Sequence, residues 1–95
     1  MNTDITKHLI ISGRVQGVGF RYFTKKSAES LGVSGWVKNL RSGDVEAVLQ
    51  GNLESVTEMM NRLETGPTTA RVDEIEELDD KPNTQSRVNG FNIKR

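Results

Sequence analysis

The spacing of apolar residues changes from a strand pattern to a helix pattern within the first third of the chain. Residues 7–15 alternate with period two, and both faces are partly apolar, as in a strand of a sheet. A segment rich in turn residues follows at 16–19, and from Phe20 to Leu31 the apolar positions recur at helical spacing. Gly32 stands where a left-handed residue commonly ends a helix. The pattern predicts a strand, a tight glycine loop and a helix, in that order.

The middle of the chain predicts two further strands and a second helix. A hairpin signal at 41–44 separates a strand over residues 33–40 from a half-buried strand over residues 45–50. The helix is expected to begin after Asn52, a residue type that commonly caps helix N-termini, and to end at Gly66-Pro67. Its apolar stripe consists of Leu53, Val56, Met59, Met60 and Leu63.

The last third of the chain predicts two short strands separated by a polar loop. The segment 70–78 loses its apolar alternation between Val72 and Ile75, so we expect a β-bulge or a ragged edge there. The acidic run 73–80 is more typical of a solvated edge strand than of a cation site. Residues 79–89 are predicted to form an exposed loop, and residues 88–93 a short last strand.

This order of elements predicts one domain, residues 1–95, of the α+β class. The order is β-α-β-β-α-β with one further short strand, and two amphipathic helices must cover one face of one sheet. We therefore expect a ferredoxin-like split β-α-β two-layer sandwich, with an antiparallel sheet of four to five strands. The first and third strands are expected to pair at the centre of the sheet.

The amino-acid composition excludes several kinds of functional site. The 95 residues include no cysteine and a single histidine, which excludes disulfides and thiolate metal sites and argues against zinc. That histidine, His8, is expected on a sheet face or at the surface rather than in acid–base catalysis. No apolar run approaches the roughly 18 residues of a membrane span, and the first residues do not resemble a secretory h-region, so we expect neither a span nor a leader. We expect a cytoplasmic monomer with no metal, no cofactor and no membrane partner.

The formal net charge of zero conceals an uneven distribution of charge along the chain. Residues 1–41 hold seven basic and two acidic residues, residues 44–80 hold two basic and eleven acidic, and residues 81–95 hold four basic and none acidic. Nucleic-acid-binding domains usually carry a net positive charge, so the total argues against a nucleic acid partner. The basic first third instead indicates a local site for a small anion.

The best candidate for such a site is the glycine loop together with the arginine that follows it. Gly17 and Gly19 allow the backbone to approach a ligand, and successive free N–H groups in such a loop bind anions. Arg21 falls in the first turn of the predicted helix, where the helix dipole disfavours a cation unless an anion offsets it. On spacing alone a purely structural connection is the alternative, because the loop matches neither the dinucleotide fingerprint nor a P-loop.

Asn39, at the end of the second predicted strand, is a second candidate. It is either a solvent-facing amide or a group that positions a water molecule through its oxygen. Spacing alone leaves open whether Asn39 reaches the glycine loop. Phe20, Tyr22 and Phe23 are candidates to line a substrate pocket, although helical spacing makes Phe20 and Phe23 core residues first.

An RNA-recognition module is the alternative from another functional class, because it shares the order of elements. Its aromatic motif belongs on the third strand. Here the aromatic run 20–23 leads into the first helix, and the third strand carries no aromatic residue. We therefore expect no RNA binding.

Several runs of the sequence resemble the acylphosphatases. The two longest are Gly13-x-Val15-Gln16-Gly17-Val18-Gly19-Phe20-Arg21 and Leu31-Gly32-Val33-x-Gly35-Trp36-Val37-Lys38-Asn39. The similarity continues through Gly66-Pro67-x-x-Ala70-x-Val72 and Gly90-Phe91-x-Ile93-x-Arg95, so it spans nearly the whole chain. Lys38 stands where the family frequently has arginine.

The resemblance implies a metal-independent hydrolase that cleaves the carboxyl–phosphate bond of small acyl phosphates to a carboxylate and inorganic phosphate. By motif match, Arg21 and Asn39 are the implied catalytic residues, and Asn39 would hold the attacking water. Inorganic phosphate is expected as product and inhibitor. The alternative within the resemblance is a non-catalytic or carbamoyl-phosphate-handling module, like the acylphosphatase-like domain of larger hydrogenase-maturation proteins. The implied phosphate-binding loop consists of Gln16, Gly17, Val18, Gly19 and Phe20.

Overall fold

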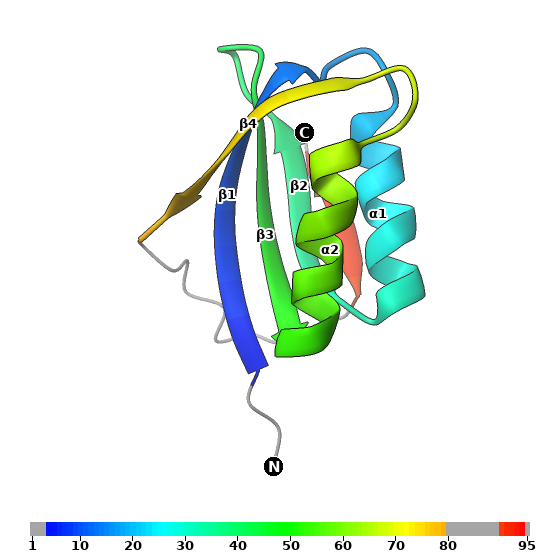
Figure 1. The fold of residues 1–95 in the computed structure, drawn as a ribbon, viewed down its shortest axis with the longest axis vertical. Coiled ribbons are helices and arrows are strands. Elements are labelled where there is room, and N and C mark those ends of the chain that lie inside the picture. The colour runs from blue at the N-terminus through cyan, green and yellow to red at the C-terminus, as the bar shows by residue number, and fades with distance from the viewer. Residues whose placement is uncertain (1–3, 80–89, 95) are drawn as a thin grey trace.

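The computed structural model describes residues 4–79 and 90–94, which form one five-stranded sheet with two helices against one face (Figure 1). The elements are β1 (Asp4–Arg14), α1 (Phe20–Leu31), β2 (Ser34–Asn39), β3 (Val45–Asn52), α2 (Leu53–Thr65), β4 (Arg71–Leu78) and β5 (Phe91–Lys94). This order confirms the predicted ferredoxin-like arrangement. Apart from Asp79, the predicted loop over residues 79–89 lies outside the described residues, as does the predicted start of the last strand.

The strand order in the sheet is β4-β1-β3-β2-β5, so β1 and β3 lie centrally, as predicted. The sheet is not wholly antiparallel, because β5 pairs in parallel with β2. β1 and β2 run in the same direction, because both are antiparallel to β3. β4 runs opposite to them, and β5 runs opposite to β4, so β5 has the direction of β2. Since the last strand joins the edge beside β2, the resulting pair is parallel.

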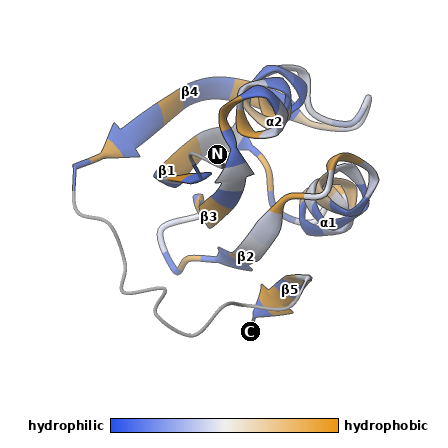
Figure 2. Cartoon of the chain, turned by 90° about the horizontal axis from the view of Figure 1, so that it is seen from below, coloured by the Kyte–Doolittle hydropathy of each residue, from blue (hydrophilic) through white to orange (hydrophobic). Residues whose placement is uncertain are grey.

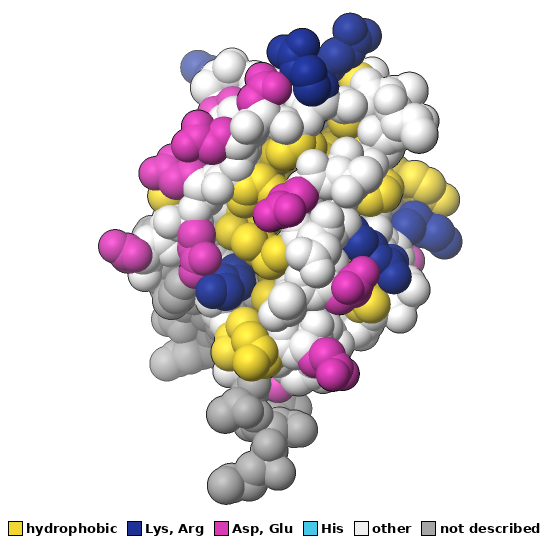
Figure 3. Space-filling model, viewed as in Figure 1, with side chains coloured by type: hydrophobic (Ala, Val, Ile, Leu, Met, Phe, Trp, Pro, Cys, Tyr) yellow, Lys and Arg dark blue, Asp and Glu magenta, His cyan; other side chains and the backbone are white. Residues whose placement is uncertain are grey.

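The predicted irregularity in β4 is a β-bulge at the sheet edge. Ser12 of β1 pairs with Glu74, but Gly13 pairs with Val72, which leaves Asp73 as the extra residue of β4. Figure 3 shows acidic side chains gathered along this edge, where the carboxylates of β4 are exposed. Bulges and charges on an edge strand oppose pairing with another molecule, so the acidic run has a structural explanation.

The core lies between the two helices and one face of the sheet, as Figure 2 shows. α1 ends at Gly32, which has a φ of 73°, and Asn52 caps α2 by accepting a hydrogen bond of 2.8 Å from the Ser55 N–H. Both helix ends are therefore where the sequence predicts them. Neither helix is long and apolar enough to cross a membrane, within the residues described. Both layers contribute fully buried side chains, among them Leu9, Ile11, Val37, Leu49, Phe20, Val56, Met59 and Leu63.

His8 lies on the sheet face that the helices leave uncovered. Its neighbour in sequence, Leu9, is buried on the helix side, and successive strand residues point to opposite faces. The His8 side chain is 8% exposed, and its Nε2 lies 2.6 Å from Oε2 of Glu46 on β3. Its ring also packs edge-on against Trp36. The expected sheet-face position is confirmed, and the contacts of His8 explain its presence without catalysis.

Two leucines provide a matched test of where the stability of this fold lies. Leu49 on β3 is fully buried, whereas Leu53 at the start of α2 is 61% exposed. Leu49→Ala should lower the free energy of unfolding by about 2–5 kcal/mol, because it leaves a cavity in the core. Leu53→Ala should change it by about 0.5 kcal/mol or less. Urea denaturation followed by circular dichroism measures both, and equal losses would contradict this assignment of the core.

Candidate active site

The candidate site is a pocket of about 200 Å³ at the edge where β1 and β2 end and α1 begins. β1 and β2 run in the same direction on either side of β3, so their C-terminal ends lie at the same edge of the sheet. The loop that leaves β1 must turn there to start α1. The pocket is lined by Val15, Gly17, Gly19, Phe20, Arg21, Tyr22, Asn39 and Ile93.

The glycine loop has a backbone that only glycine adopts readily. Gly17 and Gly19 have φ angles of 74° and 79°, and a Cβ at either position would meet no atom within 4 Å. The requirement for glycine is therefore one of conformation rather than space, and the loop is open on that side. Gly19 occupies the N-cap position of α1, and it has no side chain that could accept a hydrogen bond from the helix. The first turn of α1 also contains no acidic residue. The first N–H groups of α1 are thus left for a ligand or solvent.

Side chains from two other parts of the chain hold the loop in place. The Gln16 side-chain amide donates hydrogen bonds of 2.7 Å and 2.8 Å to the carbonyls of Leu40 and Asp44, which flank the β2–β3 hairpin turn. The Thr69 hydroxyl donates a 2.7 Å hydrogen bond to the carbonyl of Val18. Both tethers leave the loop N–H groups unused. The sequence placed Gln16 in the loop but gave no signal for its side-chain contacts or for Thr69.

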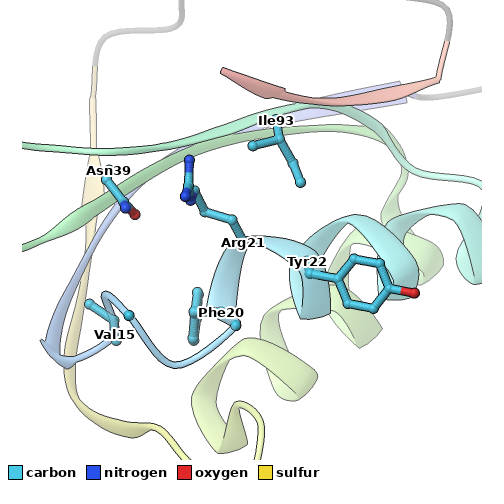
Figure 4. Close-up of a pocket in the computed structure, with 8 residues that line it drawn as sticks. Val15, Phe20, Arg21, Tyr22, Asn39 and Ile93 are labelled. Carbon is cyan, nitrogen blue, oxygen red and sulfur yellow. The ribbon is translucent and has the colours of Figure 1, made fainter. Parts of the chain in front are cut away.

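Arg21 and Asn39 meet at this pocket, which answers the question that spacing left open. Figure 4 shows both side chains directed into the space above the loop, Arg21 from α1 and Asn39 from β2. Among the described residues Arg21 forms no ion pair, in the first turn of a helix whose dipole disfavours its charge. An anion bound beside it would offset that cost.

The amide oxygen of Asn39 is a buried acceptor without a donor. Within the described part of the chain it is the one buried side-chain polar atom that lacks a hydrogen-bond partner. Leaving such an atom unsatisfied costs about 1–3 kcal/mol, so its persistence calls for a specific explanation. A water molecule or ligand held in the pocket would donate the missing hydrogen bond.

The other predicted site residues divide into two groups. Gly17, Gly19 and Phe20 line the pocket, although the Phe20 side chain is 1% exposed and packs in the core, as predicted. Gln16 and Val18 are not among the lining residues, and Gln16 acts through the tether described above. Sequence reasoning missed Ile93. In the sequence, Ile93 stands two residues after Phe91, which places both side chains on the same face of a strand. Phe91 is buried on that face.

The family model for acylphosphatases matches residues 7–93, which include every element of the pocket. The chain belongs to the acylphosphatase family. It is 51% identical over 74 residues to the acylphosphatase of Nitrobacter winogradskyi, covering 78% of this chain and 75% of that one. It is 38% identical over 91 residues to the acylphosphatase of Bifidobacterium longum, covering 96% and 93% of the two chains.

Solved structures agree with this assignment. The acylphosphatase from Bacillus subtilis superposes with a TM-score of 0.86 at 29% identity, covering 98% of this chain and 100% of that one. The acylphosphatase from Coxiella burnetii gives 0.79 at 36% identity, covering 96% and 93%. T. kodakarensis HypF also matches, with a TM-score of 0.81 at 33% identity over 94% of this chain but only 12% of its own length. The acylphosphatase fold thus occurs both in chains of this size and within a longer one.

The chemistry available in this acylphosphatase pocket is that of hydrogen bonds and one positive charge. Its lining residues include a guanidinium, a carboxamide and backbone N–H groups, but no carboxylate or imidazole. Across residues 4–79 and 90–94, no three His, Cys, Asp or Glu side chains gather where they could hold a metal ion. The pocket can bind an anion and orient a water molecule, and nothing in its lining offers a strong general base.

Removing the Gln16 tether tests whether it holds the loop. Gln16→Ala deletes two hydrogen bonds to carbonyls, so the free energy of unfolding should fall by about 1–2 kcal/mol. Backbone ¹⁵N order parameters of residues 16–19 should fall below those of the unmodified protein. Gln50→Ala is the control, because Gln50 lies on β3 away from the loop. Unchanged order parameters in residues 16–19 of the Gln16 variant would show that the loop holds itself.

Proposed function

We propose that this chain hydrolyses small acyl phosphates to a carboxylate and inorganic phosphate, and that it does so without a metal ion. The proposal rests on membership of the acylphosphatase family and on one observation at the site. Within residues 4–79 and 90–94, an arginine without an ion pair and an amide oxygen without a hydrogen bond face the same pocket, above a loop whose N–H groups neither tether uses. The arginine supplies a positive charge that can bind a phosphoryl group, and the amide oxygen supplies an acceptor that can hold a water molecule.

In this proposal Arg21 and the glycine loop bind the phosphoryl group. The guanidinium offers a planar pair of donors that matches two phosphate oxygens, and loop N–H groups from Gln16 to Phe20 supply further donors. In phosphoryl transfer the negative charge spreads over the equatorial oxygens in the transition state. Donors fixed around those oxygens therefore lower the barrier chiefly by electrostatic stabilisation.

Asn39 orients the attacking water. Its amide oxygen accepts a hydrogen bond from the water, whose oxygen forms the new bond to phosphorus while the bond from phosphorus to the acyl oxygen breaks. The leaving group departs as a carboxylate, which needs no proton from the protein. Because an amide is a poor base, the proton of the water passes to a phosphoryl oxygen of the substrate.

We extend the proposal to the substrates, the oligomeric state and the location of the protein. Residues 1–95 act as a single acylphosphatase-like domain, and acetyl and carbamoyl phosphate are within the proposed substrate class. Inorganic phosphate is the product and a competitive inhibitor. Because Arg21 and Asn39 lie in one pocket of one chain, a monomer contains the complete site. We place the enzyme in the cytoplasm, on the ground that its proposed substrates are small phosphorylated molecules.

Arg21 provides the first test of this mechanism. Arg21→Ala should lower kcat/KM for acetyl phosphate by about 10²–10³ and weaken inhibition by inorganic phosphate, because the main positive charge of the pocket is lost. Arg21→Lys should be nearly as slow, since an ammonium lacks the planar pair of donors. The assay is hydrolysis in the presence of a metal chelator. Arg62→Lys on α2 is the matched control, and equal activity of the Arg21→Ala variant and the unmodified enzyme would contradict the proposal.

Asn39 provides a separate test, because its proposed role concerns water rather than phosphate. Asn39→Ala should lower kcat strongly while the inhibition constant of inorganic phosphate changes less than about threefold. Asn92→Ala, an exposed asparagine on β5, should leave both quantities unchanged. Loss of phosphate inhibition with normal turnover in the Asn39 variant would assign Asn39 to phosphate binding instead.

A further inference from the structure

The exposed apolar side chains of this protein are concentrated at the candidate site. Among the described residues three large hydrophobic side chains are exposed: Tyr22 (63%), Leu53 (61%) and Ile93 (39%). Tyr22 and Ile93 both line the pocket that holds Arg21, whereas Leu53 lies at the start of α2 and does not. Ligand sites typically combine apolar walls with a few polar groups that fix orientation. The two pocket residues therefore need an explanation that Leu53 does not.

Ile93 is exposed because the pocket occupies the space that would otherwise cover it. Phe91 on the same face of β5 is 2% exposed, and the Lys25 side chain of α1 donates a 3.0 Å hydrogen bond to the Phe91 carbonyl. β5 is thus fixed against α1 at Phe91. Two residues later, Ile93 lies beside the first turn of the helix, where its side chain points toward Arg21 (Figure 4).

The geometry of phosphoryl transfer determines which side of the pocket the acyl group occupies. The attacking and leaving oxygens lie roughly in line on opposite sides of phosphorus. In Figure 4, the Arg21 side chain lies between Asn39 on one side and Ile93 on the other, and the Tyr22 ring extends from α1 on the Ile93 side, away from Arg21. If water approaches from Asn39 and Arg21 holds the phosphoryl group, the leaving group departs toward Ile93 and Tyr22.

From this placement, and resting on the function proposed above, we propose that Tyr22 and Ile93 form the acyl-binding subsite. The subsite selects acyl phosphates whose acyl group has an apolar body, aromatic or branched aliphatic. Covering both side chains with such a group removes apolar surface from water, which favours binding. An acetyl group brings only one methyl group to these side chains, and a carbamoyl group brings none, so both remove less apolar surface from water than an aromatic or branched aliphatic group does.

The test compares two substrates in matched variants. Ile93→Thr keeps a β-branched side chain on the strand, and Tyr22→Gln removes the ring from an exposed helix position. The ratio of kcat/KM for benzoyl phosphate to that for acetyl phosphate should fall about tenfold in the double variant, with most of the change in KM for benzoyl phosphate. Leu53→Gln, which alters the third exposed side chain outside the pocket, should leave the ratio within twofold.

Inhibitors test the same subsite in the unmodified enzyme and so need no variant to fold. Benzylphosphonate should inhibit about tenfold more strongly than methylphosphonate, because only the former reaches the apolar side chains. Equal inhibition, or an unchanged substrate ratio in the double variant, would overturn the subsite while leaving the proposed hydrolase intact. Failure of the unmodified enzyme to hydrolyse either acyl phosphate would overturn the proposed function, and the subsite with it.

Discussion

The side-chain amide of Gln16 joins the two parts of the chain from which the site is built. Its hydrogen bonds to the Leu40 and Asp44 carbonyls fix the glycine loop against the β2–β3 hairpin. Arg21 follows that loop and Asn39 directly precedes Leu40, so the same contact sets the position of the guanidinium relative to the amide. Because the tether is made by a side chain, it uses none of the loop N–H groups, which are the donors of the proposed anion site.

The topology of the sheet makes this contact possible. β3 lies between β1 and β2 and runs opposite to both, so β1 and β2 end at one edge, where α1 also begins. β5 adds an apolar wall to the same edge, since its parallel pairing with β2 directs Ile93 toward the start of α1. The opposite face of the sheet carries a separate set of contacts, in which Glu46 pairs with His8. The pocket and that cluster are therefore independent features of the fold.

Local patterns in the sequence predicted most of the fold. Gly32 and Asn52 placed helix ends correctly because capping depends on a few neighbouring residues, and the lost alternation of β4 located its bulge at Asp73. The parallel pairing of β5 was not predicted, because four residues carry no signal for direction. The candidate residues Arg21 and Asn39 were named by motif. The contacts of Gln16, the Asn39 oxygen that lacks a donor among the described residues, and the place of Ile93 in the pocket depend on segments distant in sequence. No local pattern encodes such contacts.

Titration of the ¹⁵N-labelled protein with inorganic phosphate, followed by NMR, tests the proposed site most directly. If the glycine loop and Arg21 form the anion site, saturable shifts should concentrate at the backbone amides of residues 16–21 and at the Arg21 side-chain Nε. Lys38 and Lys94 lie near Trp36 on the other face of the sheet and should be little affected. Shifts concentrated at those lysines, with no saturation at residues 16–21, would contradict the proposed site.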